Sequence, residues 1–174
     1  MSKNIHKIII RLTDGFLYCF IGPFGVLYII PQFLLNASNI KSRSGFGIPA
    51  LETVGIILMW FGAALAVWSS MIMLLWGKGT PLVTSAPQKI VHRNIYAYVR
   101  HPMMWSLLIV TLGESLMYGN IILIFWLIAL SRIIYLFVVK YEEPQLERRF
   151  GKSWRKYCQK VPRFIPRFNK KCNS

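Results

Sequence analysis

Long uncharged stretches dominate the chain, and within them the apolar residues are continuous rather than periodic. Residues 16–35 and 54–76 are runs of 20 and 23 residues without a charge. At a rise of about 1.5 Å per residue, each is long enough as a helix to cross a hydrocarbon core of about 30 Å. Both runs are predicted membrane spans. We expect the first to be retained, because its apolar run is longer than that of a signal peptide.

Two further apolar runs stand back to back. Residues 103–118 and 121–139 are separated only by Gly119 and Asn120. So short a connection joins antiparallel neighbours, which predicts a helical hairpin whose 16-residue first arm tilts or stops short of the far surface. The pattern predicts an all-α polytopic membrane protein with about four transmembrane helices, built as a single membrane domain over residues 1–174.

After the last span the pattern becomes amphipathic. Basic residues fill the positions between apolar ones that recur every three or four residues, at Leu146, Phe150, Trp154, Tyr157 and Val161. This spacing predicts a C-terminal helix lying in the headgroup plane, with anionic lipid headgroups as partners of its basic face and a second role as a lid left open. Glu143 and Pro144 suit the first turn of a new helix. Gly151 is expected to weaken it at mid-length, and Pro162 to end it.

Composition and charge support a membrane protein. Hydrophobic residues make up 55% of the 174 positions and charged residues only 16%, whereas about a quarter of a soluble domain is charged. The net charge of +15 would suggest nucleic acid in a soluble chain, but anionic lipids explain it here, and no nucleic-acid partner is expected. The three cysteines have no metal-ligand spacing, so neither a metal site nor a disulfide framework is predicted.

The distribution of basic residues predicts the orientation. Of the 21 Lys and Arg residues, 18 lie before the first span, between the second and third, or after the fourth, and two lie between the first and second. By the positive-inside rule, both termini are cytoplasmic. The expected location is a bacterial inner membrane or an internal membrane.

Three polar segments stand at the cytoplasmic boundary, at residues 77–81, 96–102 and 141–144. Each alone has an ordinary explanation as a helix end or as a basic stop to a span. Together they can meet, and three of the six acidic residues of the chain, Glu142, Glu143 and Glu147, lie here. We therefore expect a polar site built from segments 77–102 and 140–167.

Two charged residues, Glu114 and Arg132, are placed inside the predicted spans, where a charge is costly and a functional role is the default hypothesis. Counted from the hairpin turn, they are about one and about three helical turns away, so they are separated by more than about 10 Å along the axis. An ion pair between them is not expected. Arg132 is expected to face protein, water or a bound anionic group.

Three motifs occur in order along residues 50 to 167. They are Gly77-Lys78-Gly79-Thr80-Pro81, then Tyr96-x-Tyr98-Val99-Arg100-His101-Pro102-Met103, then Glu142-Glu143-Pro144-x-Leu146-x-x-x-Phe150-Gly151 followed by Val161-Pro162-Arg163-x-Ile165-Pro166. Their order and shared placement resemble the isoprenylcysteine carboxyl methyltransferase and phospholipid methyltransferase group of integral membrane enzymes. The resemblance implies S-adenosylmethionine as methyl donor, no metal, and a lipophilic acceptor that enters sideways from the bilayer.

The resemblance also implies roles for particular residues. Arg100 is expected to bind the donor's carboxylate, His101 and Glu143 to form its polar rim, and Glu142 to contact its ribose or amino group. Arg100, His101 and Glu142 are the catalytic candidates. The full set of expected donor-site residues is Gly77, Gly79, Tyr98, Arg100, His101, Pro102, Glu142 and Glu143.

Departures from the family pattern point to the acceptor. Met104 and Trp154 stand where the family commonly has tyrosine, and both are expected beside the pocket. With Trp105 and Arg132 they are the candidate acceptor contacts. Isoprenylated cysteine, a phospholipid amine, another lipophile and a thiol all suit this architecture, and a homo-oligomer is compatible with so small a body.

Two other functions stay open. One is a membrane lipid reductase that uses NADPH, although Gly77-Lys78-Gly79 is not a nucleotide-binding fingerprint after a strand. The other is a non-enzymatic four-span transporter or structural membrane protein, for which the important residues would be Glu114 or Arg132 near the midplane. A methyltransferase function instead predicts that the important residues lie at the cytoplasmic rim.

Overall fold

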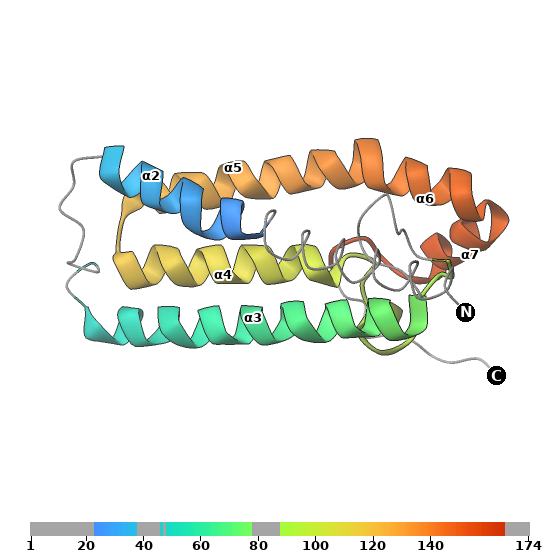
Figure 1. Cartoon of the computed structure of the whole chain (residues 1–174), viewed down its shortest axis with the longest axis horizontal. Helices are drawn as coiled ribbons and strands as arrows, with labels where there is room; N and C mark the ends of the chain where they lie inside the picture. The colour runs from blue at the N-terminus through green and yellow to red at the C-terminus, as the bar shows by residue number, and fades with distance from the viewer. Residues whose placement is uncertain (1–22, 38–45, 47, 78–87, 166–174) are drawn as a thin grey trace, which may run out of the picture.

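The structure, a computed structural model, describes residues 23–37, 46, 48–77 and 88–165 of the chain. No strand occurs in these ranges, which agrees with the all-α prediction. The described elements are η1 (Gly25–Ile29), α2 (Ile30–Ala37), α3 (Pro49–Gly77), η3 (Asn94–Ala97), α4 (Pro102–Tyr118), α5 (Ile121–Phe137), η4 (Val138–Glu142), α6 (Glu143–Phe150) and α7 (Lys152–Lys160). Figure 1 shows α3, α4 and α5 side by side along the longest axis, with α2 at one end and α7 at the other.

Two helices have the length and hydropathy needed to cross a bilayer. They are α3, with 29 residues, and the continuous helix Ile121–Phe150, with 30. They contain the predicted spans 54–76 and 121–139. The predicted span 103–118 is the 17-residue α4, short as expected. Of the predicted span 16–35, residues 16–22 lie outside the described part of the chain, and Gly25–Ala37 forms a shorter apolar helix.

The turn between α4 and α5 confirms the predicted hairpin. Gly119 adopts the left-handed conformation, with φ 58° and ψ 33°, which a glycine reaches without steric cost. Asn120 caps α5, because its side-chain oxygen accepts a hydrogen bond from the backbone N–H of Ile122 at 2.9 Å. The two residues that the sequence offers between the apolar runs therefore supply both a helix stop and a helix start.

The contact between α3 and α4 depends on the absence of side chains. A Cβ atom added to Gly113 would lie 2.6 Å from the carbonyl oxygen of Gly55, and one added to Gly62 would lie 2.7 Å from a methyl carbon of Val110. Small residues let helix backbones approach closely inside a membrane, where apolar burial alone drives little association. This contact fixes the start of α4 relative to the end of α3, where the site lies.

Both π-helical turns stand directly before a proline. In η1 the N–H of Ile30 donates to the Gly25 carbonyl, and in η4 the N–H of Glu143 donates to the Val138 carbonyl; Pro31 and Pro144 come next. A proline ring clashes with the carbonyl four residues earlier in a regular α-helix, and a wider turn relieves this clash. Because η4 absorbs Pro144, α5 runs on into α6. Helix α6 begins at Glu143, as the sequence indicated, but it continues from α5 instead of standing apart from it.

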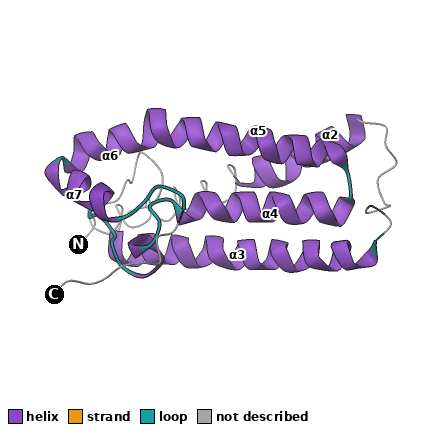
Figure 2. Ribbon diagram, turned by 180° about the vertical axis from the view of Figure 1, so that it is seen from behind, coloured by secondary structure: helices purple, strands orange, loops and turns teal. Residues whose placement is uncertain are grey.

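The predicted single amphipathic helix is wrong, because Gly151 divides it. Gly151 has φ 50° and ψ −121°, a conformation that L side chains rarely adopt, and it separates α6 from α7. In Figures 1 and 2, α6 follows the axis of α5, whereas α7 turns back. The apolar stripe was identified correctly, but it packs against the protein itself: Trp154, Tyr157 and Val161 form a buried cluster with Ile90, Leu146 and Phe150.

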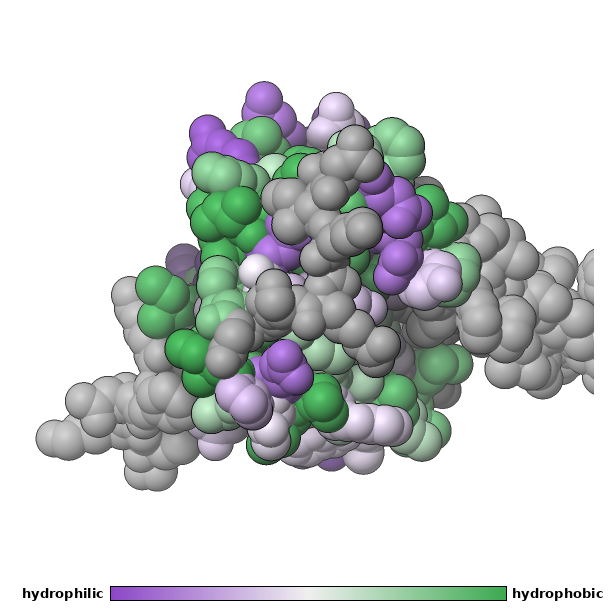
Figure 3. Space-filling model, turned by 90° about the vertical axis from the view of Figure 1, so that its left-hand side faces the viewer, coloured by the Kyte–Doolittle hydropathy of each residue, from purple (hydrophilic) through white to green (hydrophobic). Residues whose placement is uncertain are grey.

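The outer surface agrees with a bilayer as solvent. Large exposed apolar side chains follow α3, among them Trp60, Phe61, Trp68 and Leu75. Figure 3 views the end that carries the α4–α5 turn, where hydrophilic and hydrophobic side chains are interspersed on the described surface. Such a mixture suits a membrane–water boundary, whereas a continuous apolar surface suits lipid chains.

Candidate functional site

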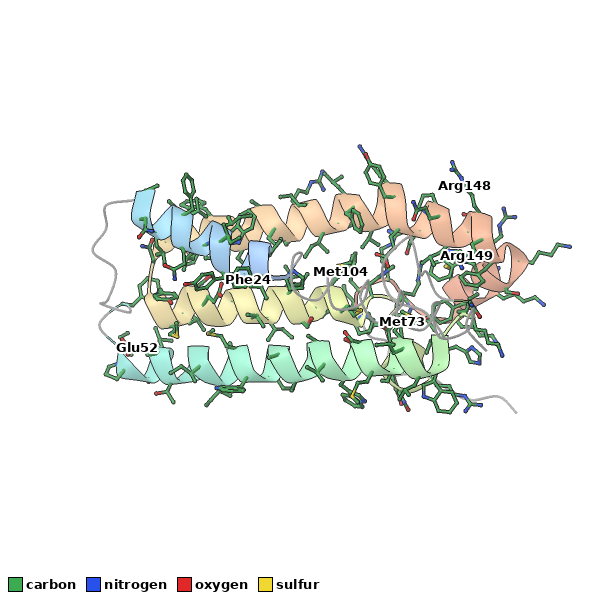
Figure 4. The ribbon with its side chains drawn as sticks, in the orientation of Figure 1. Phe24, Glu52, Met73, Met104, Arg148 and Arg149 are labelled. Carbon is green, nitrogen blue, oxygen red and sulfur yellow. The ribbon has the colours of Figure 1, made fainter. Side chains whose placement is uncertain are left out.

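A cavity of about 290 Å³ lies where α3 ends and α4 begins. Its walls come from the last turns of α3, residues 89–91, Tyr96, the start of α4, and helices α6 and α7. One part of the lining is apolar, including Met73, Met104 and Phe150, and the other carries Lys89, Arg100, His101, Glu142, Gln145 and Arg149. Figure 4 shows Met73 and Met104 toward this end of the helices and Glu52 at the opposite end.

His101 stands at the N-terminus of α4 with carboxylates on both sides. It is the residue before Pro102, which begins the helix and needs no N–H there. The side chain is almost completely buried, with the residue only 4% exposed. Its Nδ1 lies 3.2 Å from Oε1 of Glu142, and its Nε2 lies 3.4 Å from Oε1 of Glu143. Only the protonated imidazolium can donate to both at once.

This pair of carboxylates controls the protonation of His101. Burial lowers the pKa of the imidazole, but the hydrogen bonds and negative charges of Glu142 and Glu143 outweigh it and leave the pKa raised above its usual 6.5. The folded protein therefore favours the positively charged form of His101.

Glu143 is the centre of the charge network. Its Oε1 accepts hydrogen bonds from Nη1 of Arg100 at 2.7 Å and from Nε of Arg163 at 2.9 Å, and its Oε2 accepts one from Nη2 of Arg163. Burial alone would raise the pKa of Glu143, but its hydrogen bonds and the two guanidinium charges lower it to about 2. Glu143 is therefore ionised and neutralised within the protein.

Arg100 joins three parts of the chain. Its Nε donates to the carbonyl oxygen of Val161 at 2.8 Å, and its Nη1 reaches Glu143 and lies 3.2 Å from Sγ of Cys158. Its backbone N–H donates to the Pro162 carbonyl at 3.1 Å. Nη2 forms no hydrogen bond to any residue that the structure describes. Arg100 therefore lines the cavity with one end of its guanidinium still able to bind an anionic group.

Glu142 carries the clearest sign of a ligand. Its Oε1 faces His101, while Oε2 is buried and has no hydrogen-bond partner among the described residues. A buried carboxylate oxygen without a donor is costly, so such an atom in a residue that lines a cavity indicates a missing hydrogen-bond donor. A hydroxyl or an ammonium group of a ligand would satisfy it.

Helix α7 closes the cavity through a chain of hydrogen bonds. The phenol of Tyr157 donates to the backbone carbonyl of Tyr96 at 2.6 Å, and the phenol of Tyr96 donates to the Ser69 carbonyl on α3 at 3.4 Å. Burial raises the pKa of Tyr157 above its usual value, so the phenol keeps its proton. Helix α7 is thus tied to α3 through the short helix η3.

The structure brings most of the predicted site residues together. Arg100, His101, Pro102 and Glu142 line the cavity, and Glu143 stands directly behind them. Two of the predicted acceptor contacts, Met104 and Trp154, also line it.

Other predicted residues lie elsewhere. Tyr98 is 48% exposed and is not part of the cavity wall. Gly77 is buried outside the cavity and accepts a hydrogen bond from the N–H of Gln88 at 2.8 Å, so it positions the chain that leads to Lys89. Gly79 lies outside the described residues. Trp105 donates to the Phe164 carbonyl at 2.9 Å instead of facing the cavity.

The two charges inside the spans stay apart, as expected. The guanidinium of Arg132 lies over the ring of Tyr135 at 5.7 Å and outside the cavity wall. Glu114 is buried on α4, with Oε2 unpartnered among the described residues, and it forms no ion pair with Arg132.

Sequence reasoning missed Arg163, Tyr96 and Tyr157 as contributors to the site. Each acts over a long sequence distance: Tyr157 reaches back 61 positions and Arg163 reaches back 20. Arg163 belonged to the quoted Val161-Pro162-Arg163 motif, which is the signal that could have identified it. Nothing in the local sequence marks Tyr96 as more important than Tyr98.

Comparisons with known proteins agree with this geometry. The family described as phospholipid methyltransferase matches residues 51–153, more than half of the chain. The chain is also 36% identical over 83 residues to a protein of Schizosaccharomyces pombe named Protein-S-isoprenylcysteine O-methyltransferase. That alignment covers 44% of this chain and 33% of the yeast protein, so the chain matches about a third of its relative's length. No solved structure matches.

The family match includes the cavity's walls from α3, α4 and α6, and it ends at Ser153, before most of α7. Several residues that carry the resemblance in sequence, among them Arg100, His101 and Glu142, are therefore gathered around one cavity. The chain belongs to the phospholipid methyltransferase family, a family of integral membrane enzymes that take their methyl group from S-adenosylmethionine.

Proposed function

We propose that this protein transfers a methyl group from S-adenosylmethionine to a lipophilic acceptor at the cytoplasmic face of a membrane. The observation that carries the proposal is the buried, unpartnered Oε2 of Glu142, a residue of the cavity wall, where charged and apolar side chains line the same cavity. Such a mixed lining suits a polar donor together with a lipid-like acceptor.

The polar groups of the cavity fit the donor. S-adenosylmethionine carries an ammonium group, a carboxylate and a ribose diol beside its sulfonium. Oε2 of Glu142 accepts from the ammonium or a ribose hydroxyl, and Nη2 of Arg100 binds the carboxylate by a charge-assisted hydrogen bond. When bound, the donor supplies an activated methyl group. The residues of the chain align the two reactants and exclude water.

The charge of the cavity favours an anionic acceptor. Its described lining holds the cations Lys89, Arg100 and Arg149 and the readily protonated His101, against one carboxylate, Glu142. The donor is itself a cation at neutral pH, so a cationic phospholipid amine would be repelled more than a carboxylate. We therefore propose carboxyl O-methylation of an isoprenylcysteine-like substrate, the reaction named for the yeast relative. A carboxylate acceptor needs no general base, whereas an amine would.

The proposed topology has four crossings with both termini in the cytoplasm. It places the cavity at the cytoplasmic end, on the side where a water-soluble donor is found. The exposed basic residues of this end, which include Arg148, Lys152, Lys156 and Lys160, are then near anionic headgroups, each contributing about 1 kcal/mol close to the surface. Figure 4 shows Arg148 at this end of the molecule.

Equilibrium binding of S-adenosylmethionine to the detergent-purified full chain tests the donor site. Saturable binding is expected, and Glu142→Gln and Arg100→Ala should each weaken it by about tenfold or more, because each removes a charge-assisted hydrogen bond. Glu147→Gln is the matched control, since Glu147 is outside the cavity and pairs with the exposed Arg155. Thermal unfolding of each variant confirms that it is folded.

Three results would count against the proposal. Folded wild-type protein that does not bind the donor would favour the reductase or transporter alternatives. Binding that Glu142→Gln leaves unchanged would remove Glu142 from the site. For the acceptor, methyl transfer to a farnesylcysteine analogue but not to phosphatidylethanolamine is expected, and the reverse preference would overturn the assignment to carboxylates.

A further inference from the structure

The chain that follows α7 forms a strap, defined here as residues Val161–Phe164, across the start of α4. Val161 is extended, with φ −116° and ψ 123°, as the residue before a proline prefers, and it ends α7. The next residue, Pro162, has no N–H with which to continue a helix. The sequence therefore turns the chain out of α7 and lays it back along the site.

All four residues of the strap contact the site or its supports. The carbonyl of Val161 accepts from Nε of Arg100, and the carbonyl of Pro162 accepts from the backbone N–H of the same residue. The guanidinium of Arg163 binds both carboxylate oxygens of Glu143. The carbonyl of Phe164 accepts from the indole of Trp105.

The strap lies behind the cavity. Neither its four residues nor Glu143 is part of the cavity wall. The ring of Phe164 lies 6.0 Å from that of His101 and packs against the buried cluster of Met104, Leu130, Ile134 and Val138. The strap therefore contacts residues of the cavity wall without being part of that wall itself.

Among the contacts of the strap, the Arg163–Glu143 ion pair is the one that affects two residues of the cavity wall at once. Glu143 contacts both Arg100 and His101, so the position of its carboxylate sets the position of both. Without Arg163, both oxygens of Glu143 lose a guanidinium donor, and the carboxylate can rotate. A bidentate guanidinium contact fixes the plane of a carboxylate, which a single contact does not.

We propose that Arg163 is a positioning residue for the donor site. By binding Glu143 on both oxygens, it holds Arg100 and His101 against the cavity wall, and it makes donor binding depend on the docking of the strap. This inference rests on the proposed function, since the donor affinity is its readout. Arg163 itself touches no part of the cavity.

A double-mutant cycle on the full-length protein tests the proposal, with S-adenosylmethionine as the titrated ligand. Arg163→Ala should weaken donor binding by about tenfold in the wild-type background, since two charge-assisted hydrogen bonds are lost. In a Glu143→Gln background the same change should weaken binding by less than about twofold, because the residue through which Arg163 acts is already impaired. Equal losses in both backgrounds would overturn the proposal.

Two further variants keep the test sharp. Arg163→Lys keeps the charge but contacts one oxygen at a time, so it should recover at least about threefold of the affinity lost by Arg163→Ala. Arg155→Ala is the matched control, because it removes an arginine from an exposed ion pair and should leave the affinity unchanged. If Arg163→Ala is poorly folded, the lysine variant alone decides: it should bind the donor more weakly than the wild type, and wild-type affinity contradicts the proposal.

Failure of the inference and failure of the proposed function give different results. Wild-type protein that is folded but does not bind S-adenosylmethionine would overturn the function itself. Wild-type protein that binds, with an Arg163→Ala variant that binds equally well, would overturn only the positioning role.

Discussion

The α3–α4 contact and the charge network at the start of α4 are built in opposite ways. In the first, glycines at positions 55, 62 and 113 leave no room for a side chain, and backbone meets backbone. In the second, long side chains reach over a distance, and Arg100 meets Glu143 and Val161 at 43 and 61 positions along the chain. Helix α4 is common to the two regions: one lies along it and the other at its start.

This difference shows that the two regions should fail in different ways. The helix contact is made at these glycines by backbone atoms that lie too close to accept a side chain, so added volume should disrupt it. The network is satisfied by mutual charge, so it should respond to charge, protonation and hydrogen-bond loss while its helices stay in place. The helix contact thus sets the positions of the backbones, and the charge network sets the positions of the polar side-chain groups.

The largest expected effect comes from adding volume at the helix contact. Gly113→Val places its Cβ 2.6 Å from the Gly55 carbonyl oxygen, a backbone atom that cannot rotate away, so the two helices must separate. The cost should be about 3 kcal/mol or more, at the upper end of overpacking effects. Reversible unfolding in mixed micelles measures it.

The matched control is Gly25→Ala, since nothing lies within 4 Å of a Cβ added there. Its stability should stay within about 1 kcal/mol of the wild type. Equal stability of the Gly113→Val variant would show that the helix contact tolerates an added side chain, and the contrast between the two regions would be lost.

The second prediction uses pH, to which the charge network should respond. The pKa of His101 is raised above 6.5, so its contribution to stability is complete below pH 6.5 and is lost as the pH rises through the raised pKa. The pKa of Glu143 is lowered from 4.5 to about 2, so its contribution is present above pH 4.5 and is lost as the pH falls toward 2. The contribution of the network to stability should be greatest between these limits.

Thermal unfolding from about pH 2 to about pH 9 measures this dependence, and His101→Gln should remove its alkaline side. An alkaline loss that persists in the variant would assign the titration to another group. Donor affinity followed over the same range reports on the site.

The sequence predicted one of these regions better than the other. Uncharged runs and the Gly119-Asn120 turn give the helices and the hairpin, because helix length and turn geometry depend on neighbouring residues. The polar segments at residues 96–102 and 141–144 do meet, since both lie at the same end of the long helices. Which residue of a segment faces the cavity depends on rotation about a helix, and this was missed for Tyr98.

The pairing of Arg100 with Glu143 could not be predicted from the sequence. Both were expected to bind the donor, yet each satisfies the other. The continuation of α5 into α6 was missed for a local reason: Pro144 reads as a helix start, and only the wide turn η4 allows it inside a helix. The role of Arg163 was hidden because the strap's path depends on where α7 ends.

The third prediction concerns the hydrogen bond that ties helix α7 to η3 beside the cavity. Tyr157→Phe removes the hydrogen bond to the Tyr96 carbonyl and leaves that buried carbonyl without this donor, which should cost about 1 kcal/mol. The bound donor should therefore leave several times faster, while the helix contact is unaffected. Stopped-flow displacement of the donor measures the rate. Tyr28→Phe is the control, because Tyr28 is exposed and lies far from Tyr157 along the chain. Equal release rates for both variants would show that the Tyr157 hydrogen bond does not affect release of the donor.

The smallest expected effect tests whether burial, rather than residue type, gives the network its importance. Arg155 and Glu147 form an ion pair at 2.7 Å, as close as that of Arg100 and Glu143, but the Arg155 side chain is 71% exposed. Water and salt screen such a pair, so Arg155→Ala should change stability by less than about 1 kcal/mol. Unfolding at low and high salt measures this, and the small difference should vanish at high salt. If Arg155→Ala loses as much stability as Arg163→Ala, then the geometry of an arginine–glutamate contact sets its contribution to stability, whether the contact is buried or exposed.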